Sequence, residues 1–168
     1  HADRHVRYAA RVALEHQKID QWQNRVFEEK EPRALIAAAV ALARQGDKSL
    51  QAKLLTALDA IDFAALDEPG QLDLLRAYAL SFVRMGRPDR GTTARIAARL
   101  DEFYPAKSND LNRELSRVLV YLDSPTVITK TLALMQTPTE QNLENIKELL
   151  RRNPRYGNDI YKMMKNHP

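Results

Sequence analysis

The sequence predicts an all-α fold in which short helices follow one another in pairs and each pair stacks on the next. Three observations lead to this prediction. Apolar residues recur at helical spacing along the whole chain of 168 residues, prolines separate these apolar runs, and alanine and leucine, both strong helix formers, are the commonest residues. A pair of amphipathic helices leaves an apolar face uncovered, so each pair needs a stacked neighbour.

The composition also excludes several kinds of protein. The chain has no cysteine, which rules out disulfides, a thiolate nucleophile, cysteine-bound zinc and a C-x-x-C-H haem attachment within it. The most apolar stretch, residues 34–43, fits a buried helix and is too short to cross a membrane. We therefore expect a helical domain with no membrane-spanning segment and no cofactor.

Four helices are expected in the N-terminal part of the chain, at residues 3–16, 20–29, 32–45 and 48–61. Asp3 suits the N-cap of the first helix, because its carboxylate can accept hydrogen bonds from the free amides of the first turn. Val6 begins the apolar stripe of this helix, and the second helix surrounds Trp22. Pro32 suits the first turn of the third helix, Gly46 follows its end, and a leucine-rich run marks the fourth.

Six more helices are expected in the rest of the chain, at residues 70–85, 89–103, 109–122, 125–136, 139–152 and 155–166. The first of these lies between Pro69 and Gly86. Prolines separate the later ones, because proline disfavours the interior of a helix but is tolerated where a helix begins. These separating residues are Pro88, Pro105, Pro125, Pro138 and Pro154.

The helical pairs recur at an interval of about 40 residues. Gly46 and Gly86 are 40 positions apart, and the apolar residues Leu42 and Phe82 stand four positions before them. We expect both glycines to adopt the left-handed backbone that often ends a helix and that carries no Cβ penalty for glycine. Two helices in about 40 residues is the period of HEAT and armadillo arrays.

Residues 3–14 resemble the second helix of a HEAT-like repeat, whose pattern has an aspartate, a valine–arginine pair, and then small and apolar residues at helical spacing. Asp3, Val6 and Arg7 match the start of that pattern, and Arg113 is a later counterpart of Arg7. The resemblance implies a right-handed α-solenoid of about four to five HEAT-like helical pairs. Residues 1–168 would then form a single HEAT-like repeat domain, which we expect to be a fragment of a longer chain.

The stretch from residue 111 to 122, with Ser124, Pro125 and residues 130–132 after it, is similar to HEAT domains of large bacterial multidomain proteins. In those proteins the array stands beside other modules, often a c-type haem domain or a β-propeller, and the proteins are commonly exported. The resemblance therefore implies an exported or periplasmic bacterial protein. Its partner would be another protein or a neighbouring domain of the same chain.

Three polar residues, Asn112, Arg113 and Ser116, stand out on the otherwise apolar helix expected at 109–122. We expect them to have a structural role. Arg113 would pair with Asp110, with Glu114 or with a carboxylate of a neighbouring repeat.

The whole chain is only mildly basic, with 26 Lys and Arg against 22 Asp and Glu, but its basic residues gather in two places. Clustered cations can bind phosphate backbones or acidic partners, and the alternative is that they form solvated helix faces. Trp22 is a further candidate, as an aromatic anchor for a peptide, although packing between repeats is favoured. The basic interaction candidates are Arg84, Arg87, Arg95 and Arg99, followed by Arg151, Arg152 and Arg155.

The chain contains no glycine-rich phosphate loop, no G-x-S-x-G and no H-E-x-x-H. His1 and His5 are four positions apart but have no third ligand in a metalloenzyme pattern, so no metal site is expected. We expect a non-enzymatic helical-repeat scaffold that mediates protein–protein or interdomain contacts. The alternative is a nucleic-acid-binding HEAT-like domain related to the alkylpurine DNA glycosylases; a chromophore lyase of the phycobiliprotein kind has only the fold in its favour.

Overall fold

The computed structural model describes residues 3–136 and contains, within that range, eight α-helices, two short 3-10 helices and no strand. The 3-10 helices are η1 (Ile19–Gln21) and η2 (Lys48–Leu50). The all-α prediction is confirmed for this part of the chain, and the helices expected at 139–152 and 155–166 lie outside it. The α-helices are α1 (Arg4–Glu15), α2 (Gln23–Val26), α3 (Pro32–Gln45), α4 (Gln51–Asp59), α5 (Glu68–Met85), α6 (Arg90–Asp101), α7 (Asn109–Tyr121) and α8 (Val127–Gln136).

Side-chain caps fix where most of the longer helices begin. The predicted cap of α1 is confirmed, since the Asp3 carboxylate accepts from the His5 amide at 2.7 Å. Helix α5 begins two residues earlier than expected, at Glu68, because Pro69 takes a first-turn position where its missing N–H costs no hydrogen bond. The caps of the later helices are Glu31 for α3, Asp67 for α5, Asp89 for α6 and Ser108 for α7.

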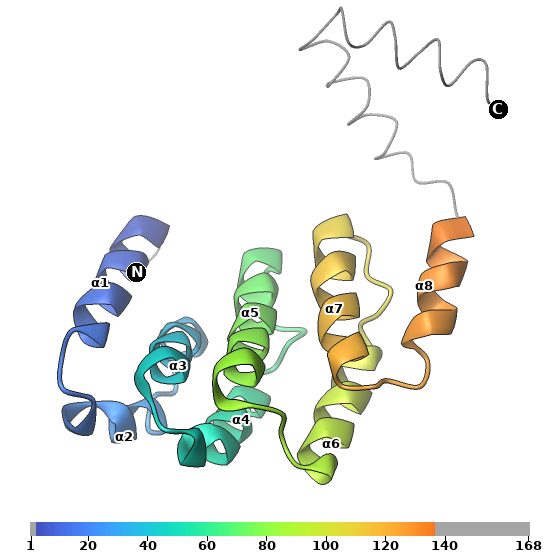
Figure 1. The fold of residues 1–168 in the computed structure, drawn as a ribbon. Helices are drawn as coiled ribbons and strands as arrows, with labels where there is room; N and C mark the ends of the chain where they lie inside the picture. The colour runs from blue at the N-terminus through green and yellow to red at the C-terminus, as the bar shows by residue number, and fades with distance from the viewer. Residues whose placement is uncertain (1–2, 137–168) are drawn as a thin grey trace, which may run out of the picture. The chain divides into compact units, whose positions relative to one another are not determined.

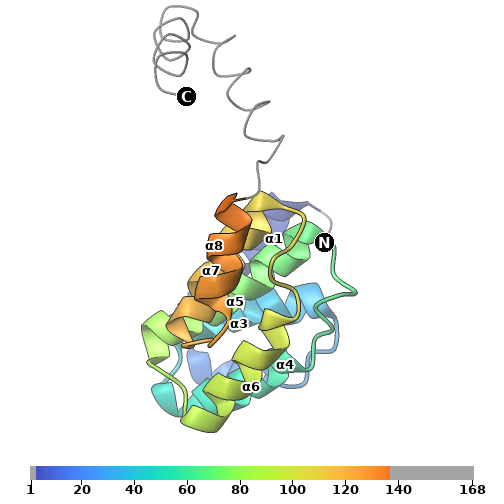
Figure 2. The ribbon, with the colours of Figure 1, turned by 90° about the vertical axis from the view of Figure 1, so that its right-hand side faces the viewer.

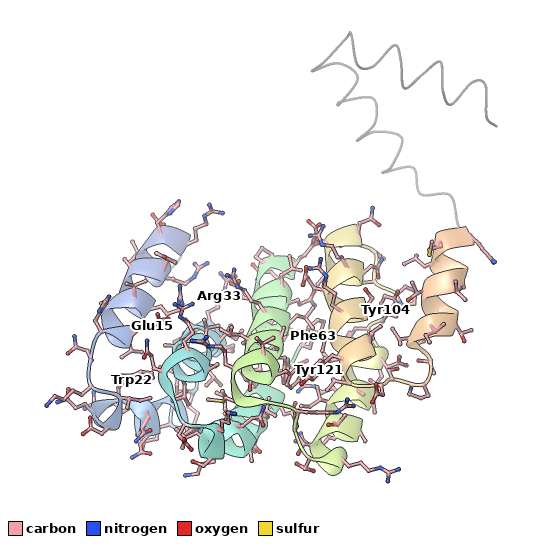
Figure 3. All side chains as sticks on the ribbon, viewed as in Figure 1. Glu15, Trp22, Arg33, Phe63, Tyr104 and Tyr121 are labelled. Atoms are coloured by element: carbon pink, nitrogen blue, oxygen red, sulfur yellow. The ribbon has the colours of Figure 1, made fainter. Side chains whose placement is uncertain are left out.

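The single helix expected at residues 20–29 is wrong. The short elements η1 and α2 replace it, and the break falls at Trp22, whose φ of −132° lies outside the helical range. The Trp22 side chain is 6% exposed and its indole Nε1 donates to the Gln17 carbonyl at 3.5 Å (Figure 3). Burial of this large ring outweighs the helical preference of the segment, and Trp22 is a packing residue rather than an exposed anchor.

The chain divides into two units, residues 1–131 and 132–168; of the second, only the end of α8 is described. Within the first unit, α1 contacts α3, α3 contacts α5, and α5 contacts α7 (Figure 1). Helix α2 packs on α3, α4 on α3 and α5, and α6 on α7, and α4 and α6 lie on the same side of the row in both views (Figure 2). Each helix of the row therefore touches the next one in chain order.

Three hydrogen bonds in the described part of the chain join residues that are 40 positions apart and lie in or beside different helices. The interval equals the one predicted from the glycines. The donors and their acceptors are Arg84 and the Arg44 carbonyl, Arg99 and the Asp59 carbonyl, and Ser108 and the Glu68 carboxylate.

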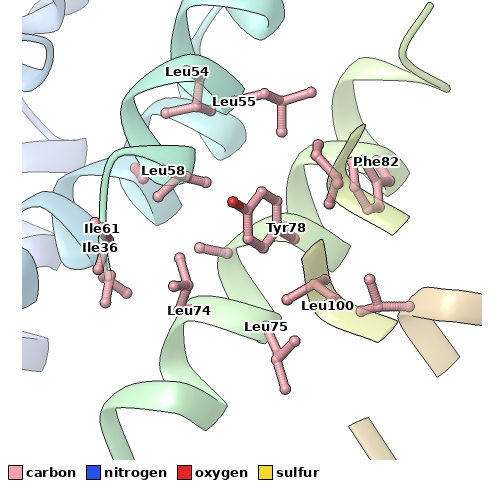
Figure 4. Close-up of a cluster of buried hydrophobic side chains, with 14 of the residues drawn as sticks. Ile36, Leu54, Leu55, Leu58, Ile61, Leu74, Leu75, Tyr78, Phe82 and Leu100 are labelled. Carbon is pink, nitrogen blue, oxygen red and sulfur yellow. The ribbon is translucent and has the colours of Figure 1, made fainter. Parts of the chain in front are cut away.

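The core surrounds Tyr78, which is 1% exposed at the centre of α5 (Figure 4). Leucines dominate its surroundings, and burying one leucine side chain contributes about 1.5–3 kcal/mol. This core joins α4, α5 and α6 into one packed region. Its labelled members include Leu54, Leu55 and Leu58 of α4, Leu74, Leu75 and Phe82 of α5, and Leu100 of α6.

Helix α1 differs from expectation because most of its apolar stripe is exposed, although Leu14 at its end packs against the core. Val6 is 46% and Tyr8 62% exposed, and no residue of α1 is buried. Arg7 and Arg11 are half-buried instead, and Glu15 pairs with Arg44 of α3 at 3.0 Å. The expected packing role of Val6 is therefore wrong, because no described helix covers the outward face of α1.

The two glycines that suggested the repeat end their helices in different ways. Gly86 has φ of +99°, a conformation that side chains rarely adopt, and its amide donates to the Phe82 carbonyl. Gly46 has φ of −80° and ψ of 160°, so its expected left-handed conformation is wrong. Glycine is needed there for space, because a Cβ would lie 2.6 Å from the Leu42 carbonyl oxygen.

Candidate functional site

A groove of about 580 Å³ lies over α3, between α1 and α5. Its floor is one face of α3, formed by Ile36, Ala37 and Val40 at helical spacing. Ala37 and Val40 are short side chains, and Gly70 on the α5 side has none. The surface of α3 is therefore recessed between two helices that carry longer residues.

Five arginines line this groove. Arg4, Arg7 and Arg11 stand three and four positions apart, which places them on one face of α1. Arg33 comes from the first turn of α3 and Arg76 from the middle of α5. His5, Tyr8 and Asp73 complete the lining, and every guanidinium or ammonium group in it belongs to arginine.

Carboxylates neutralise part of this charge. Arg11 pairs with Glu15 at 2.6 Å and Arg33 pairs with Asp67 at 2.6 Å (Figure 3). Asp73 is the one carboxylate among the described residues that line the groove. Arg4 and Arg76 form no ion pair with any residue in 3–136, so the groove keeps an excess of positive charge.

A second hollow, of about 700 Å³, lies between α6 and the residues that follow α7. Most of its charges are matched: Arg87 pairs with Asp123 at 2.5 Å and Asp101 pairs with Lys130 at 2.7 Å, which leaves Arg90 as its one cation without an ion pair in residues 3–136. The hollow therefore offers less uncompensated charge than the groove over α3, which is the stronger candidate for a binding site.

Of the predicted cations, Arg84 and Arg87 lie at and just beyond the C-terminal end of α5 and do not line the groove. Arg84 donates to the Arg44 carbonyl at 3.4 Å. The guanidinium of Arg87 lies 5.7 Å from the ring centre of Tyr121, which stacks on Phe82 with ring centres 5.1 Å apart (Figure 3). Both arginines thus contact neighbouring helices, Arg84 at the end of α3 and Arg87 at the end of α7, and a role in binding a partner stays a prediction.

Arg95 and Arg99 of α6 meet at one carboxylate, that of Asp59 at the end of α4. Arg99 also donates to the Asp59 and Ile61 carbonyls, and the Tyr78 hydroxyl donates to Asp59 Oδ1 at 2.5 Å. Burial raises the pKa of Tyr78 well above its usual value of 10 although Arg99 opposes that rise, so the hydroxyl stays protonated and donates. This cluster joins α4, α5 and α6.

The polar residues Asn112 and Arg113 of α7 have partners in the described part of the chain, and the expected pairing of Arg113 is observed. Arg113 pairs with Asp110 at 3.0 Å and with Glu114 at 3.3 Å. The Asn112 amide donates to the Ala106 carbonyl at 2.9 Å, and its oxygen accepts from the Ala106 amide at 2.6 Å. One buried side chain therefore holds the loop between α6 and α7.

Several other expectations concern residues without a described position. The second basic group, Arg151, Arg152 and Arg155, lies outside the described residues, as does His1. In residues 3–136 no three His, Asp or Glu side chains gather as a metal site would require. No helix in that range is long and apolar enough to span a membrane.

No family model, no curated protein and no solved structure matches this chain. The HEAT-like assignment therefore stays a prediction that rests on the sequence pattern.

The groove was missed by the sequence reasoning, although a signal for it was present. Arg4, Arg7 and Arg11 are spaced as one helical face. In the sequence Asp3 and Glu15 flank these three arginines, so the segment has little net charge and does not stand out as basic. That Arg33 and Arg76 join them depends on the packing of α1 and α5 against α3.

Proposed function

We propose that this chain is a HEAT-like, right-handed α-solenoid that acts as a non-enzymatic scaffold. It would bind another protein, or a neighbouring domain of its own chain, along the row of α1, α3, α5 and α7. The chain-order contacts of these helices and the bonds between residues 40 positions apart support the repeat arrangement. By its resemblance, the protein would be bacterial and exported or periplasmic.

The observation that carries the binding role is the arginine-lined groove over α3. Five guanidinium groups line it beside an apolar floor, and Arg4 and Arg76 have no carboxylate partner among residues 3–136. Guanidinium groups that are unpaired with carboxylates and displayed in a recess are suited to recognise an anionic partner.

Nucleic-acid binding is a second candidate, because the same guanidinium groups suit phosphate oxygens. A titration of the purified chain with duplex DNA tests it directly. We expect no tight binding at about 50 mM salt, since a duplex needs a longer track of cations than this groove provides.

The scaffold role is tested with a charge-reversed groove. The variant Arg4→Glu/Arg76→Glu changes two arginines that have no ion pair in the described part of the chain, so folding should be preserved. The control Arg25→Glu/Lys107→Glu makes the same change of charge at exposed positions outside the groove.

Each tagged chain is incubated with extract of the native cells, cross-linked and quantified by mass spectrometry. Proteins that are retained by the wild type and the control but lost from the groove variant support the scaffold role. Identical sets of proteins on all three chains would count against it.

A further inference from the structure

We propose that the groove over α3 binds a short acidic polypeptide segment in which an apolar side chain is flanked by aspartate or glutamate. This inference rests on the proposed scaffold function and names the chemistry of its partner.

The floor of the groove selects an apolar side chain. Ala37 and Val40 are half-buried and present carbon atoms, Ile36 lies buried beneath them, and Tyr8 adds an aromatic ring from α1. Removing such a surface from water is favourable in proportion to its apolar area. A ligand that carries charge alone would leave this part of the groove unused.

The walls of the groove select carboxylates on both sides of that apolar group. Arg4 and Arg7 stand on the α1 side together with Arg11, which is paired with Glu15, and Arg76 stands on the α5 side with Asp73. A guanidinium group binds a carboxylate through two parallel hydrogen bonds, and all of these cations are arginines. The excess of positive charge and the flanked floor together favour an acidic peptide.

The length of the groove along α3 limits the segment. Arg33 and Val40 are seven positions apart on α3, which corresponds to about 10 Å along a helix axis. An extended peptide covers that distance with about three residues. The groove therefore fits a short linear segment, whereas a phosphodiester backbone would use the same arginines without any gain from the floor.

The experiment measures fluorescence anisotropy with two labelled probes: an acidic glutamate peptide with leucine at its centre, and the same peptide with serine in that place. The full chain should bind the leucine peptide about tenfold more tightly than the serine peptide, which corresponds to burying one apolar side chain. Arg4→Glu/Arg76→Glu should weaken the leucine peptide by about tenfold or more, while Arg25→Glu/Lys107→Glu should stay close to wild type.

A second pair of variants tests the floor. Ala37→Glu places a carboxylate in the groove, and Ala52→Glu makes the same change at an exposed position of α4. Ala37→Glu should abolish the preference for leucine over serine, and Ala52→Glu should retain it. Thermal unfolding followed by circular dichroism verifies that each variant is folded.

Three results would overturn the inference: equal affinity for the two peptides, binding that the groove variants leave unchanged, or duplex DNA that binds more tightly than the leucine peptide and is lost with Arg4→Glu/Arg76→Glu. The scaffold role is judged separately, by the cross-linking comparison. If the peptides fail while groove-dependent proteins are still captured, the peptide chemistry is wrong and the scaffold remains; if both fail, both are wrong.

Discussion

At the scale of single residues, Asp59 joins three helices. Its carboxylate receives the Tyr78 hydroxyl of α5 and faces both Arg95 and Arg99 of α6, while its side chain is 9% exposed. A buried charge is costly unless it is paired and hydrogen-bonded, and here the carboxylate is paired with two arginines while its Oδ1 accepts hydrogen bonds from Tyr78 and Arg99. Arg95 and Arg99 are therefore held by the fold, whatever else they bind.

We predict that Asp59→Ala lowers the free energy of unfolding by about 2–4 kcal/mol, because it leaves the Tyr78 hydroxyl and two guanidinium groups without their shared acceptor. Arg95 is half exposed, so water replaces part of that loss. Urea unfolding measures the change, with Asp20→Ala at an exposed position as the control. Equal destabilisation by the two variants would show that the cluster has no special role.

At the scale of elements, the start of α8 is held by one carboxylate at the end of α6. Asp101 accepts from Ser124 at 3.1 Å and from Thr126 at 2.5 Å, and Lys130 donates to it at 2.7 Å. Burial raises the pKa of Asp101, but these hydrogen bonds and the Lys130 charge outweigh it, so the pKa lies below its ordinary value of 3.8. The turn after α7 is therefore anchored by an ionised side chain.

This lowered pKa predicts how stability depends on pH. A carboxyl whose pKa is lowered on folding stabilises the protein above its unfolded pKa, near 3.9, and that contribution is lost as pH falls through the folded value. Asp101→Asn should therefore be less stable than wild type at neutral pH, and the difference should shrink below about pH 4. Urea midpoints measured across this range test it, and a difference that persists unchanged into acid would contradict the role of Asp101.

At the scale of the whole molecule, stability is expected to vary along the row of helices of the first unit. Helix α5 contacts α3, α4 and α7 and contains eight buried residues, whereas α1 contains none. A helix that buries few residues against its neighbours opens more easily than one that is packed on several sides.

Amide hydrogen exchange under native conditions tests this expectation. We predict that the amides of α1 exchange through openings of lower free energy than those of α5, because α1 loses less buried apolar surface when it detaches. Uniform protection across both helices would instead indicate one cooperative unit, as in a closed bundle.

The sequence by itself determined the helical class and most helix positions. Capping residues and prolines act within one turn of chain, so Asp3, Pro32 and Gly86 could be interpreted locally. Tertiary packing determined the backbone conformation and the exposure of side chains where the local preference was weak or was overruled. It interrupted the helix at Trp22, left Val6 exposed on α1, and bent the chain at Gly46 without a left-handed residue.

The candidate site was decided by tertiary structure alone. The arginines of α1 are adjacent on one helix, but Arg33 and Arg76 reach the same groove through contacts between residues far apart in the chain. The reverse holds for Arg95 and Arg99, whose clustering is evident in the sequence but whose charge is matched by Asp59 only after folding. Local interactions determine where helices form. Whether an arginine can bind a partner depends on which carboxylates the packing brings beside it.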